Sequence, residues 1–496
     1  MQEIQSVDKK YRCRLIQIYI YVMFSIYPLI YHNFYYDIVT CKYIFFLCAT
    51  GILLVLLLFS IPDKYFNELN LKNMHLNSND YFVIGFLAVN VVSVILSDNR
   101  LYAITGADGR NMGLLTVVAM CTLYFVISRN YVESSTFYYV LCVGSIGVSV
   151  LGIMNFLDID ILGFYNGLTY AQKLNYISTL GHIDVYTSYF SLSIPMLYII
   201  YLTVHNMGLK ILSFTALVIN MCGLVAGQCD SGYIIMFVSC VLAVALIKGK
   251  QRFTVYLLPV MVSTVIIRVM FLINDKQTHK RELSRFAKYV YSNNVCMIIM
   301  FIFAICVIIE CHITIDMSGI WKIVSAIFIA GVLSYIVAVC IFTTVLTDVH
   351  LGSMEGVLRF NDSFGSYRGY IWRLLIKDYR EMNIPEKIFG IGTDTMRPYL
   401  VEKYGDSMYV VTNAYYDNAH NELIQYLITT GIAGLAMYLG IIANSIKKGI
   451  EAYKIICLAA VICYVIQSFV NINQVVTTPL FFILLSCINK REDNLS

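Results

Sequence analysis

The sequence predicts an all-α, polytopic integral membrane protein, and two observations carry that prediction. The chain has 496 residues, of which 59% are hydrophobic and only 13% charged, and its mean hydropathy is +0.71. So few charges cannot cover the surface of a water-soluble globule. Apolar runs near membrane length recur along most of the chain, and since about 20 residues cross the hydrocarbon core, we expect roughly 12–14 transmembrane helices.

The apolar runs give the expected helix positions. They lie near residues 13–31, 43–61, 81–97, 113–128, 137–156, 183–204, 208–226, 231–247, 254–273, 294–309, 320–345, 421–445, 453–472 and 475–488. The first run has no small-residue cleavage site, so we expect it to be retained as a helix. The 15 cysteines lie mostly inside these runs and show no metal-type spacing with histidine. We interpret them as small core hydrophobes, with Cys48 and Cys463 as examples.

The basic residues between the runs predict the orientation. If every run spans, one side carries Lys9 to Arg14, Lys64, Lys72, Arg129, Lys210, Lys248 to Arg252, Lys447, Lys448, Lys490 and Arg491. The positive-inside rule makes this side cytoplasmic, with both termini on it. Residues 276–288, which include Arg281, conflict with the rule. We therefore expect the preceding run, which contains Pro259 and Arg268, to be the weakest span.

The longest interval without a membrane-length apolar run is the polar segment 347–416. We expect residues 1–346 to form an N-terminal helix bundle, residues 347–416 an extracytoplasmic loop with short helices, and residues 417–496 the C-terminal transmembrane helices. Arginine, aspartate, tyrosine and glycine are concentrated in this loop, so any chemistry is expected there.

A surface helix and a glycine turn are predicted inside this segment. Apolar residues recur at helical spacing at Ile371, Leu374, Leu375 and Tyr379. This pattern predicts a helix packed on the bundle, with Arg368 at its start. After it, Gly390 and Gly392 permit a close backbone approach in the turn 389–394, and a bare turn is the alternative interpretation.

Three shorter polar segments have simple interpretations. In the loop 105–115, Arg110 can be an interfacial arginine that extends its charged end to water. At the start of the span predicted at 183–204, Asp184 can be a charge favoured by the helix dipole. Asp230 can be a helix cap.

The run Asp417-Asn418-Ala419-His420-Asn421-Glu422 opens the helix predicted at 421–445. Asp417 or Asn418 is the expected cap, which places His420 in the first turn. The positive end of the helix disfavours the imidazolium, so His420 is expected to be neutral and able to accept a proton, and the free amides there can hold phosphate oxygens. The alternative is a histidine that only helps to start a helix. Small residues, including Gly431 and Gly434, would allow a neighbouring backbone to approach.

A family resemblance follows from these residues. The run Asn418-Ala419-His420-Asn421-Glu422-Leu423-x-x-Tyr426-Leu427-x-x-x-Gly431-x-x-Gly434-Leu435 resembles the signature of the O-antigen ligase and polymerase superfamily. The Gly106 to Leu115 loop, the Arg368 to Trp372 helix and the Gly390-Ile391-Gly392 turn come in the family's order. Two positions depart from the pattern. Asp230-Ser231-Gly232 stands where such proteins often have a Ser-Arg pair, and His182 stands where many carry Asn.

The resemblance implies a GT-C-like membrane glycosyltransferase at the outer face of the cytoplasmic membrane. It would polymerise polyprenyl diphosphate-linked repeat units into a surface polysaccharide such as a capsule or exopolysaccharide. The implied partners are a lipid-linked oligosaccharide donor, a glycan or lipid acceptor, membrane lipids and other polysaccharide-assembly membrane proteins, without nucleic acid. The implied catalytic residues are His420, Asn421 and Asp417, and those implied to bind the diphosphate or glycan are Arg368, Arg110, Asn418, Trp372 and Gly392. No metal or other cofactor is expected, because arginine can clamp phosphate bidentately.

Three alternatives stay open at the level of sequence. A ligase would use the same residues to transfer the glycan to a lipid or protein acceptor. A polysaccharide flippase or other transporter would also have many spans, but it should show internal repeats and polar groups at the bilayer midplane, and no clear repeat is visible. A scaffold without catalytic activity is compatible with the composition.

Overall fold

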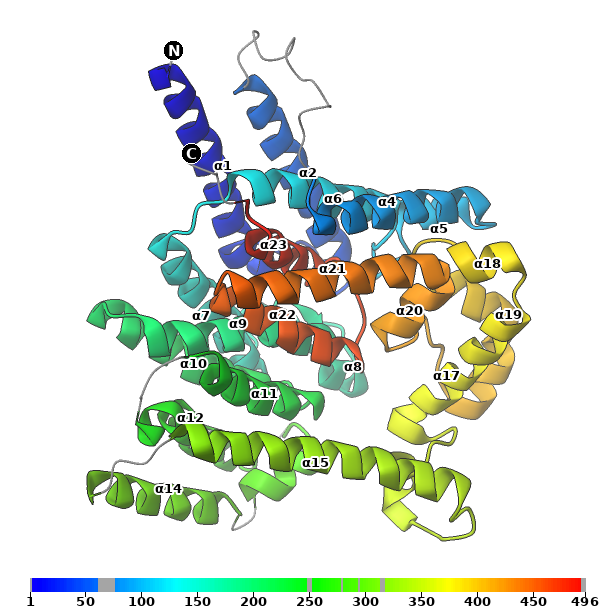
Figure 1. The fold of residues 1–496 in the computed structure, drawn as a ribbon. Helices are drawn as coiled ribbons and strands as arrows, with labels where there is room; N and C mark the ends of the chain where they lie inside the picture. Colours follow the sequence, from blue (N-terminus) through cyan, green and yellow to red (C-terminus); the bar gives the residue numbers. More distant parts are fainter. Residues whose placement is uncertain are drawn as a thin grey trace.

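The computed structural model describes residues 2–60, 76–247, 252–277, 280–292, 295–312 and 317–491. Figure 1 shows that this part of the chain is built almost wholly of helices. The predicted class, an all-α polytopic membrane protein, is confirmed. Of the basic loop residues used for orientation, Lys64, Lys72, Lys248 and Lys250 lie outside the described residues.

The first half of the chain forms α1 (Gln2–Ser25), η1 (Tyr27–Leu29), α2 (Ile38–Phe59), α4 (Ser78–Leu96), α5 (Arg100–Thr105), α6 (Leu114–Asn130), α7 (Ser135–Phe156), α8 (Tyr170–Asn175), β1 (Tyr176–Ile177), β2 (Gly181–His182), α9 (Ile183–Thr203), α10 (Met207–Ala226), α11 (Ser231–Leu246) and α12 (Phe253–Asn274). The second half forms α13 (Arg285–Ala287), the π-helix η3 (Lys288–Ser292), α14 (Val295–His312), α15 (Met317–Thr344), η4 (Gly352–Met354), α16 (Glu355–Leu358), α17 (Phe364–Glu381), α18 (Ile384–Phe389), α19 (Met396–Thr412), α20 (Glu422–Thr429), α21 (Gly431–Glu451), α22 (Ile455–Ser468) and α23 (Thr478–Ile488). The two strands pair antiparallel, with Tyr176 opposite His182.

Six helices in the described part of the chain are long and apolar enough to cross a membrane. They are α2, α4, α7, α9, α10 and α12. Shorter apolar helices, including α6, α11, α22 and α23, pack among them. The expectation that the run before residue 276 is the weakest span was wrong, since α12 is one of the six despite Pro259 and Arg268.

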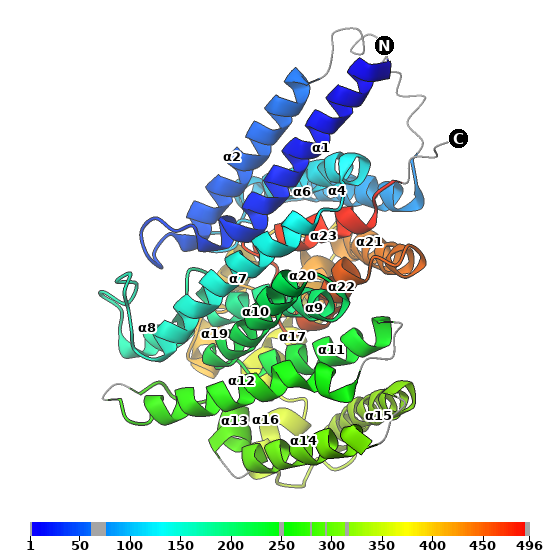
Figure 2. The ribbon, with the colours of Figure 1, turned by 90° about the vertical axis from the view of Figure 1, so that its left-hand side faces the viewer.

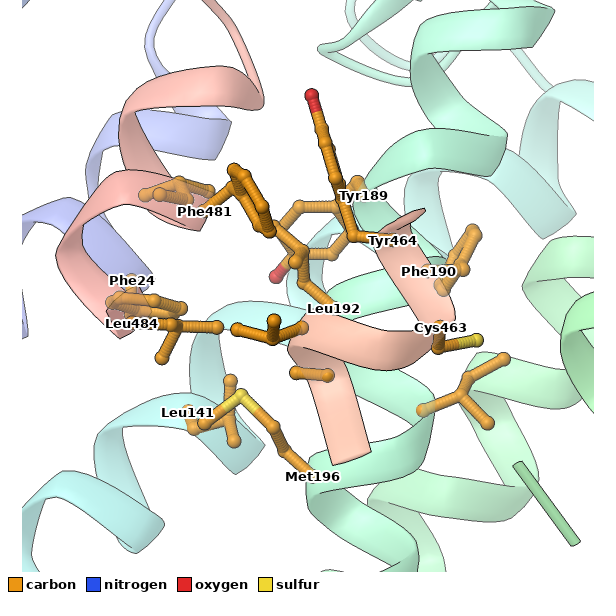
Figure 3. Close-up of a cluster of buried hydrophobic side chains, with 14 of the residues drawn as sticks. Phe24, Leu141, Tyr189, Phe190, Leu192, Met196, Cys463, Tyr464, Phe481 and Leu484 are labelled. Carbon is orange, nitrogen blue, oxygen red and sulfur yellow. The ribbon is translucent and has the colours of Figure 1, made fainter. Parts of the chain in front are cut away.

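The core is centred on α9, whose membrane-length window is fully buried. Figure 3 shows side chains from this helix meeting those of α1, α7, α22 and α23. There Tyr464 and Phe481 stack with ring centroids 4.2 Å apart. Cys463 lies in this core, as the composition predicts, whereas Cys48 is exposed on α2.

The helix predicted at 421–445 is two helices, because the chain breaks at Thr430. Gly431 has φ +67°, in the region that favours glycine. A Cβ at this position would lie 2.2 Å from the carbonyl oxygen of Ile388 in α18. The small residue therefore does allow a close backbone approach, but it does so at a helix break and not along a continuous helix.

Basic residues gather at one end of the bundle. Arg129, at the end of α6, and Arg491, after α23, both pair with the buried carboxylate of Asp80, at 2.9 and 3.0 Å. Beside them, Lys448 donates to the carbonyl of Lys490 (2.9 Å). The loop that contains Arg110 precedes α6 and so lies at the opposite end of that helix.

One arginine of the basic segment 276–288, which conflicts with the positive-inside rule, is engaged inside the protein. Arg281 is buried and donates to the carbonyl of Leu174 (2.8 Å) and the hydroxyl of Tyr165 (3.2 Å), in the connection between α7 and α9. Arg268 donates to the carbonyl of Tyr291 (2.6 Å). Arg281 therefore serves local packing, which makes its charge a poor indicator of orientation. The other basic residues of the segment, Lys276, Lys280, Arg285 and Lys288, are exposed.

Segment 347–416 forms η4 and α16 to α19, and α16 lies beside α17 (Figure 2). The helices α17 to α19 lie with α20 on the right in Figure 1. They enclose a second, smaller hydrophobic cluster that includes Ile371 and Leu375 of α17. Regular helical geometry in α17 begins at Arg368, because the three residues before it have positive φ angles of 58°, 58° and 66°. The predicted surface helix with Arg368 at its start is therefore confirmed.

Candidate functional site

His420 lies in a turn before α20 and not in the first helical turn. The helix cap is Asn421, whose Oδ1 accepts from the backbone amides of Leu423 (2.9 Å) and Ile424 (3.1 Å). The prediction that Asp417 or Asn418 caps this helix was wrong, because only Asn421 is placed to reach those two free amides. The Asn421 side chain also donates to the carbonyl of Phe469 (3.0 Å). Asn421 thus holds the helix start in position.

The turn that carries His420 is closed by its own side chains. His420 has φ 47°, which places it in the left-handed region. Asn418 accepts from the His420 amide (2.7 Å) and donates to Asp417 Oδ1 (2.5 Å). From α17, Trp372 Nε1 donates to the carbonyl of Ala419 (2.7 Å). Asn418 and Trp372 therefore act on the shape of the turn that orients His420.

Asp184 is the residue that sequence reasoning missed. Its Oδ2 lies 3.6 Å from His420 Nδ1 and 3.7 Å from His182 Nδ1. The carboxylate is mostly buried at the start of α9, and its backbone carbonyl accepts from Asn471 (2.8 Å). The local pattern Gly-His-Ile-Asp offered only a polar helix start as a signal, since the proximity to His420 comes from the packing of α9 beside the 417–421 turn.

The protonation state of His420 follows from its surroundings. Burial is the main cause that lowers its pKa, to about 4, and the charges of Arg368 and Arg110 act in the same direction against the raising effect of Asp184. The imidazole is therefore neutral at pH 7. The predicted neutrality agrees with this value, but its main cause is burial and not a position in the first turn of the helix, which His420 does not occupy.

Arg110 is held beside this turn by an ion pair. Its Nη2 lies 2.5 Å from Asp417 Oδ1, and the arginine side chain is only 11% exposed. Burial by itself would raise the pKa of Asp417, but the charge and hydrogen bond of Arg110 outweigh it and keep the pKa below its ordinary value. An arginine that extends into water does not fit this burial, so the snorkelling interpretation of Arg110 was wrong.

Arg368 is the second cation at the site. It is half-buried at the start of the regular part of α17, and its charge is among those that disfavour protonation of His420. Within the part of the chain that the structure describes, its guanidinium has no hydrogen bond or ion pair. Its donors are thus available to an anionic ligand.

The glycine turn 390–394 contacts both the end of α20 and Ser97. The amide of Gly392 donates to the carbonyl of Thr429 at the end of α20 (3.1 Å), and a Cβ on Gly392 would lie 2.3 Å from Ser97 Oγ. The close approach that its glycines permit is therefore to the protein's own backbone and side chains.

The same turn also holds the Arg110 loop. Asp394 Oδ2 accepts from the amides of Ala107 and Met112, both at 2.9 Å. Burial raises the pKa of Asp394 to about 7. This residue was also missed, although the Gly-x-Gly-x-Asp run carried a possible signal.

The departure at Asp230-Ser231-Gly232 lies close to Asp184. Ser231 Oγ accepts from Gln467 (3.1 Å) and contacts Cys229 Sγ (3.2 Å), which is itself 3.6 Å from Asp184 Oδ1. This segment contributes no arginine, and the cations whose charges act on His420 are Arg368 and Arg110.

Comparison with known proteins covers part of the candidate site. No curated protein matches the chain. Residues 289–439, which contain both Arg368 and His420, match the model of the family described as O-antigen ligase. This segment is similar to that family, and the apolar helices around it are those of a multi-pass membrane protein.

Proposed function

We propose that this protein is a membrane glycosyltransferase that polymerises polyprenyl diphosphate-linked repeat units into a surface polysaccharide. The observation that carries the proposal is a neutral His420 with Asp184 beside its Nδ1 and the arginines Arg110 and Arg368 nearby. The family match supports a role in surface polysaccharide assembly, because the matched family is described as O-antigen ligase.

In the proposed reaction His420 is the general base. With Nδ1 facing Asp184, Nε2 is the nitrogen left to take the proton of an acceptor hydroxyl. The hydroxyl oxygen forms a bond to the anomeric carbon of the donor sugar, while the bond from that carbon to the diphosphate oxygen breaks. The electron pair leaves with the polyprenyl diphosphate, and the imidazolium formed is stabilised by the Asp184 carboxylate.

The two arginines are proposed to stabilise the leaving diphosphate. Arg368 has free donors, and a planar guanidinium matches two phosphate oxygens at once. Arg110 already pairs with Asp417, so it would stabilise the diphosphate less than Arg368, through its charge and its remaining donors. Because the two arginines provide positive charge for the leaving diphosphate, the proposed reaction needs no metal ion. Metal independence stays a prediction.

Neither of the two carboxylates in the histidine motif, Glu422 and Asp417, is placed to replace His420 as the base. Both oxygens of Glu422 accept hydrogen bonds, from Tyr438 and Tyr464 at 2.8 Å each, and the side chain is buried. Asp417 is paired with Arg110. In the proposal Asp417, Asn418, Asn421, Trp372 and Gly392 position the reacting groups.

The proposed location of the reaction is the outer face of the membrane. The site lies at the end of α6 opposite Arg129 and Arg491, and the positive-inside rule assigns that basic end to the cytoplasm. Donors carried on a polyprenyl lipid could reach such a site from the bilayer.

The test is the polysaccharide that accumulates in a strain lacking the gene. Single lipid-linked repeats with no polymer are expected, since repeat units would be made but not joined. Full-length chains without attachment would favour the ligase alternative instead. Repeats retained on the cytoplasmic side would favour a transporter and contradict the proposal.

A further inference from the structure

We propose that a pocket beside α19 is the binding subsite for the acceptor glycan, an inference that rests on the proposed function. The pocket has a volume of about 800 Å³ and is lined by residues 401–407 of α19, by Arg397 and by Tyr415 to Asp417. It lies in the helical segment that precedes the His420 turn.

The pocket adjoins the turn that carries the proposed reacting group. Two of its lining residues, Tyr416 and Asp417, come directly before the turn that contains His420. The rings of Tyr416 and His420 meet edge to face, with centroids 5.7 Å apart. A glycan in the pocket would therefore end within reach of the imidazole.

The lining has the chemistry that a sugar needs. Glu402 and Asp406 are exposed, and in the described ranges neither carboxylate has a hydrogen-bond or ion-pair partner. Carboxylate oxygens accept bonds from sugar hydroxyls. Tyr415 is 59% exposed and stacks on Tyr409 with centroids 5.1 Å apart, which presents a fixed aromatic face to the C–H face of a pyranose ring.

The charge and polarity of the lining disfavour binding of the diphosphate and of the polyprenyl tail. The carboxylates of Glu402 and Asp406, unpaired in the described ranges, would repel a diphosphate, and the pocket's two cations are already engaged. Lys403 binds Asp378 (2.9 Å), and Arg397 donates to the carbonyl of Asp108 (3.1 Å). A polyprenyl tail would find too few apolar groups in this lining. The neutral glycan is the substrate part that fits.

The wall of the pocket is rigidly held. Asp378 of α17 is buried and accepts from three residues of α19, namely Tyr399 (2.8 Å), Lys403 (2.9 Å) and Tyr404 (2.5 Å). This attachment fixes α19 against α17, the helix that carries Arg368. The acceptor subsite and the diphosphate-binding arginine are thus held in one arrangement, which lowers the ordering cost of binding.

The test measures glycan binding apart from transfer. The probe is the oligosaccharide released by mild acid from the lipid-linked repeat unit of the source strain. Saturation-transfer NMR is recorded with the detergent-solubilised full-length protein carrying His420→Gln, which removes turnover. We expect signal transfer to the probe, and a loss of about tenfold or more in affinity when Tyr415→Ala or Glu402→Gln is added. The matched controls are Tyr36→Ala and Glu381→Gln, an exposed tyrosine and an exposed carboxylate outside the pocket.

The kinetic arm separates acceptor from donor. With otherwise wild-type protein and the free oligosaccharide as acceptor, Tyr415→Ala should raise the acceptor KM at least tenfold and leave kcat and the donor KM nearly unchanged. Unchanged probe affinity in both pocket variants, or a rise confined to the donor KM, would overturn the subsite. Absence of any transfer by the wild-type protein would contradict the proposed function. The affinity measurements would still show whether the pocket binds the oligosaccharide.

Discussion

His420 Nδ1 lies 3.6 Å from Asp184 Oδ2, although the two residues are far apart in the sequence. One residue belongs to the turn before α20, and the other to the first turn of α9. His182 faces the same carboxylate oxygen at 3.7 Å. The carboxylate can therefore orient the imidazole and stabilise its charged form, and this relationship underlies the first two predictions.

Replacement of His420 should abolish transfer without unfolding the protein. Because general-base catalysis contributes about 10²–10⁴-fold, we expect His420→Gln to be nearly as inactive as His420→Ala. Glutamine keeps a hydrogen-bonding group but cannot take a proton at neutral pH. The measurement is glycan transfer at equal membrane abundance. Transfer by the Gln variant at close to the wild-type rate would show that His420 is only positional.

Asp184→Asn should lower kcat, by an amount between tenfold and the roughly 10⁴-fold seen when a catalytic triad loses its orienting carboxylate. The pH profile tests the cause. Asp184 raises the pKa of His420, so its removal should move that pKa below about 4 and shift the acid limb of kcat/KM to lower pH. If the substitution instead loosened the site, water would reach the imidazole and its pKa would return towards the ordinary value of 6.5. The acid limb would then shift to higher pH. An acid limb that moves upward would therefore contradict the positioning role.

Arg368→Lys should reduce transfer despite keeping the charge. A point ammonium cannot replace a planar fork, and hydrogen bonds to charged groups contribute about 1.5–3 kcal/mol, so the expected loss is roughly 10- to 100-fold. The control is Arg373→Lys on the same helix, where the arginine is half-exposed and pairs with Asp362. Equal effects of the two substitutions on transfer would mean that α17 needs only positive charge or packing there.

Asp394 should be replaceable by Asn but not by Ala. Its pKa of about 7 means that the folded protein already tolerates the neutral carboxyl, and an amide oxygen can accept from the same backbone groups of Ala107 and Met112. Ala would leave two buried amides unpaired, at a cost of about 1–3 kcal/mol each. We expect a lower thermal unfolding midpoint and weaker transfer for Asp394→Ala alone. Similar thermal unfolding midpoints for Asp394→Asn and Asp394→Ala would contradict the proposal that the Asp394 side chain holds the Arg110 loop.

The orientation predicts which side of the membrane carries α19. Cysteine introduced at the exposed Asp406 should react with a membrane-impermeant maleimide in intact cells, after the exposed Cys48 and Cys340 are replaced by Ser. Cysteine at Lys10 is the matched control and should react only after permeabilisation. The reverse pattern would place the site on the cytoplasmic side and contradict a donor supplied at the outer face.

The sequence by itself determined the class of the protein and the elements around the motif. Hydropathy and helical spacing are properties of neighbouring residues, so they revealed the apolar helices and the surface helix that begins at Arg368. They also located His420, because an Asp-Asn-x-His-Asn run before an apolar segment is unusual in a lipid-like chain. Each of these signals lies within a few residues of the feature that it predicts.

Only the tertiary structure decided how the site is assembled. Whether Asn421 or Asn418 caps α20 depends on which side chain reaches two backbone amides, and the break at Gly431 depends on the passage of α18 beside it. The pairing of Asp184 with His420 depends on how α9 packs against a turn far along the chain. Local patterns cannot encode such contacts, because the free energy that establishes them comes from burial and hydrogen bonding between segments distant in sequence.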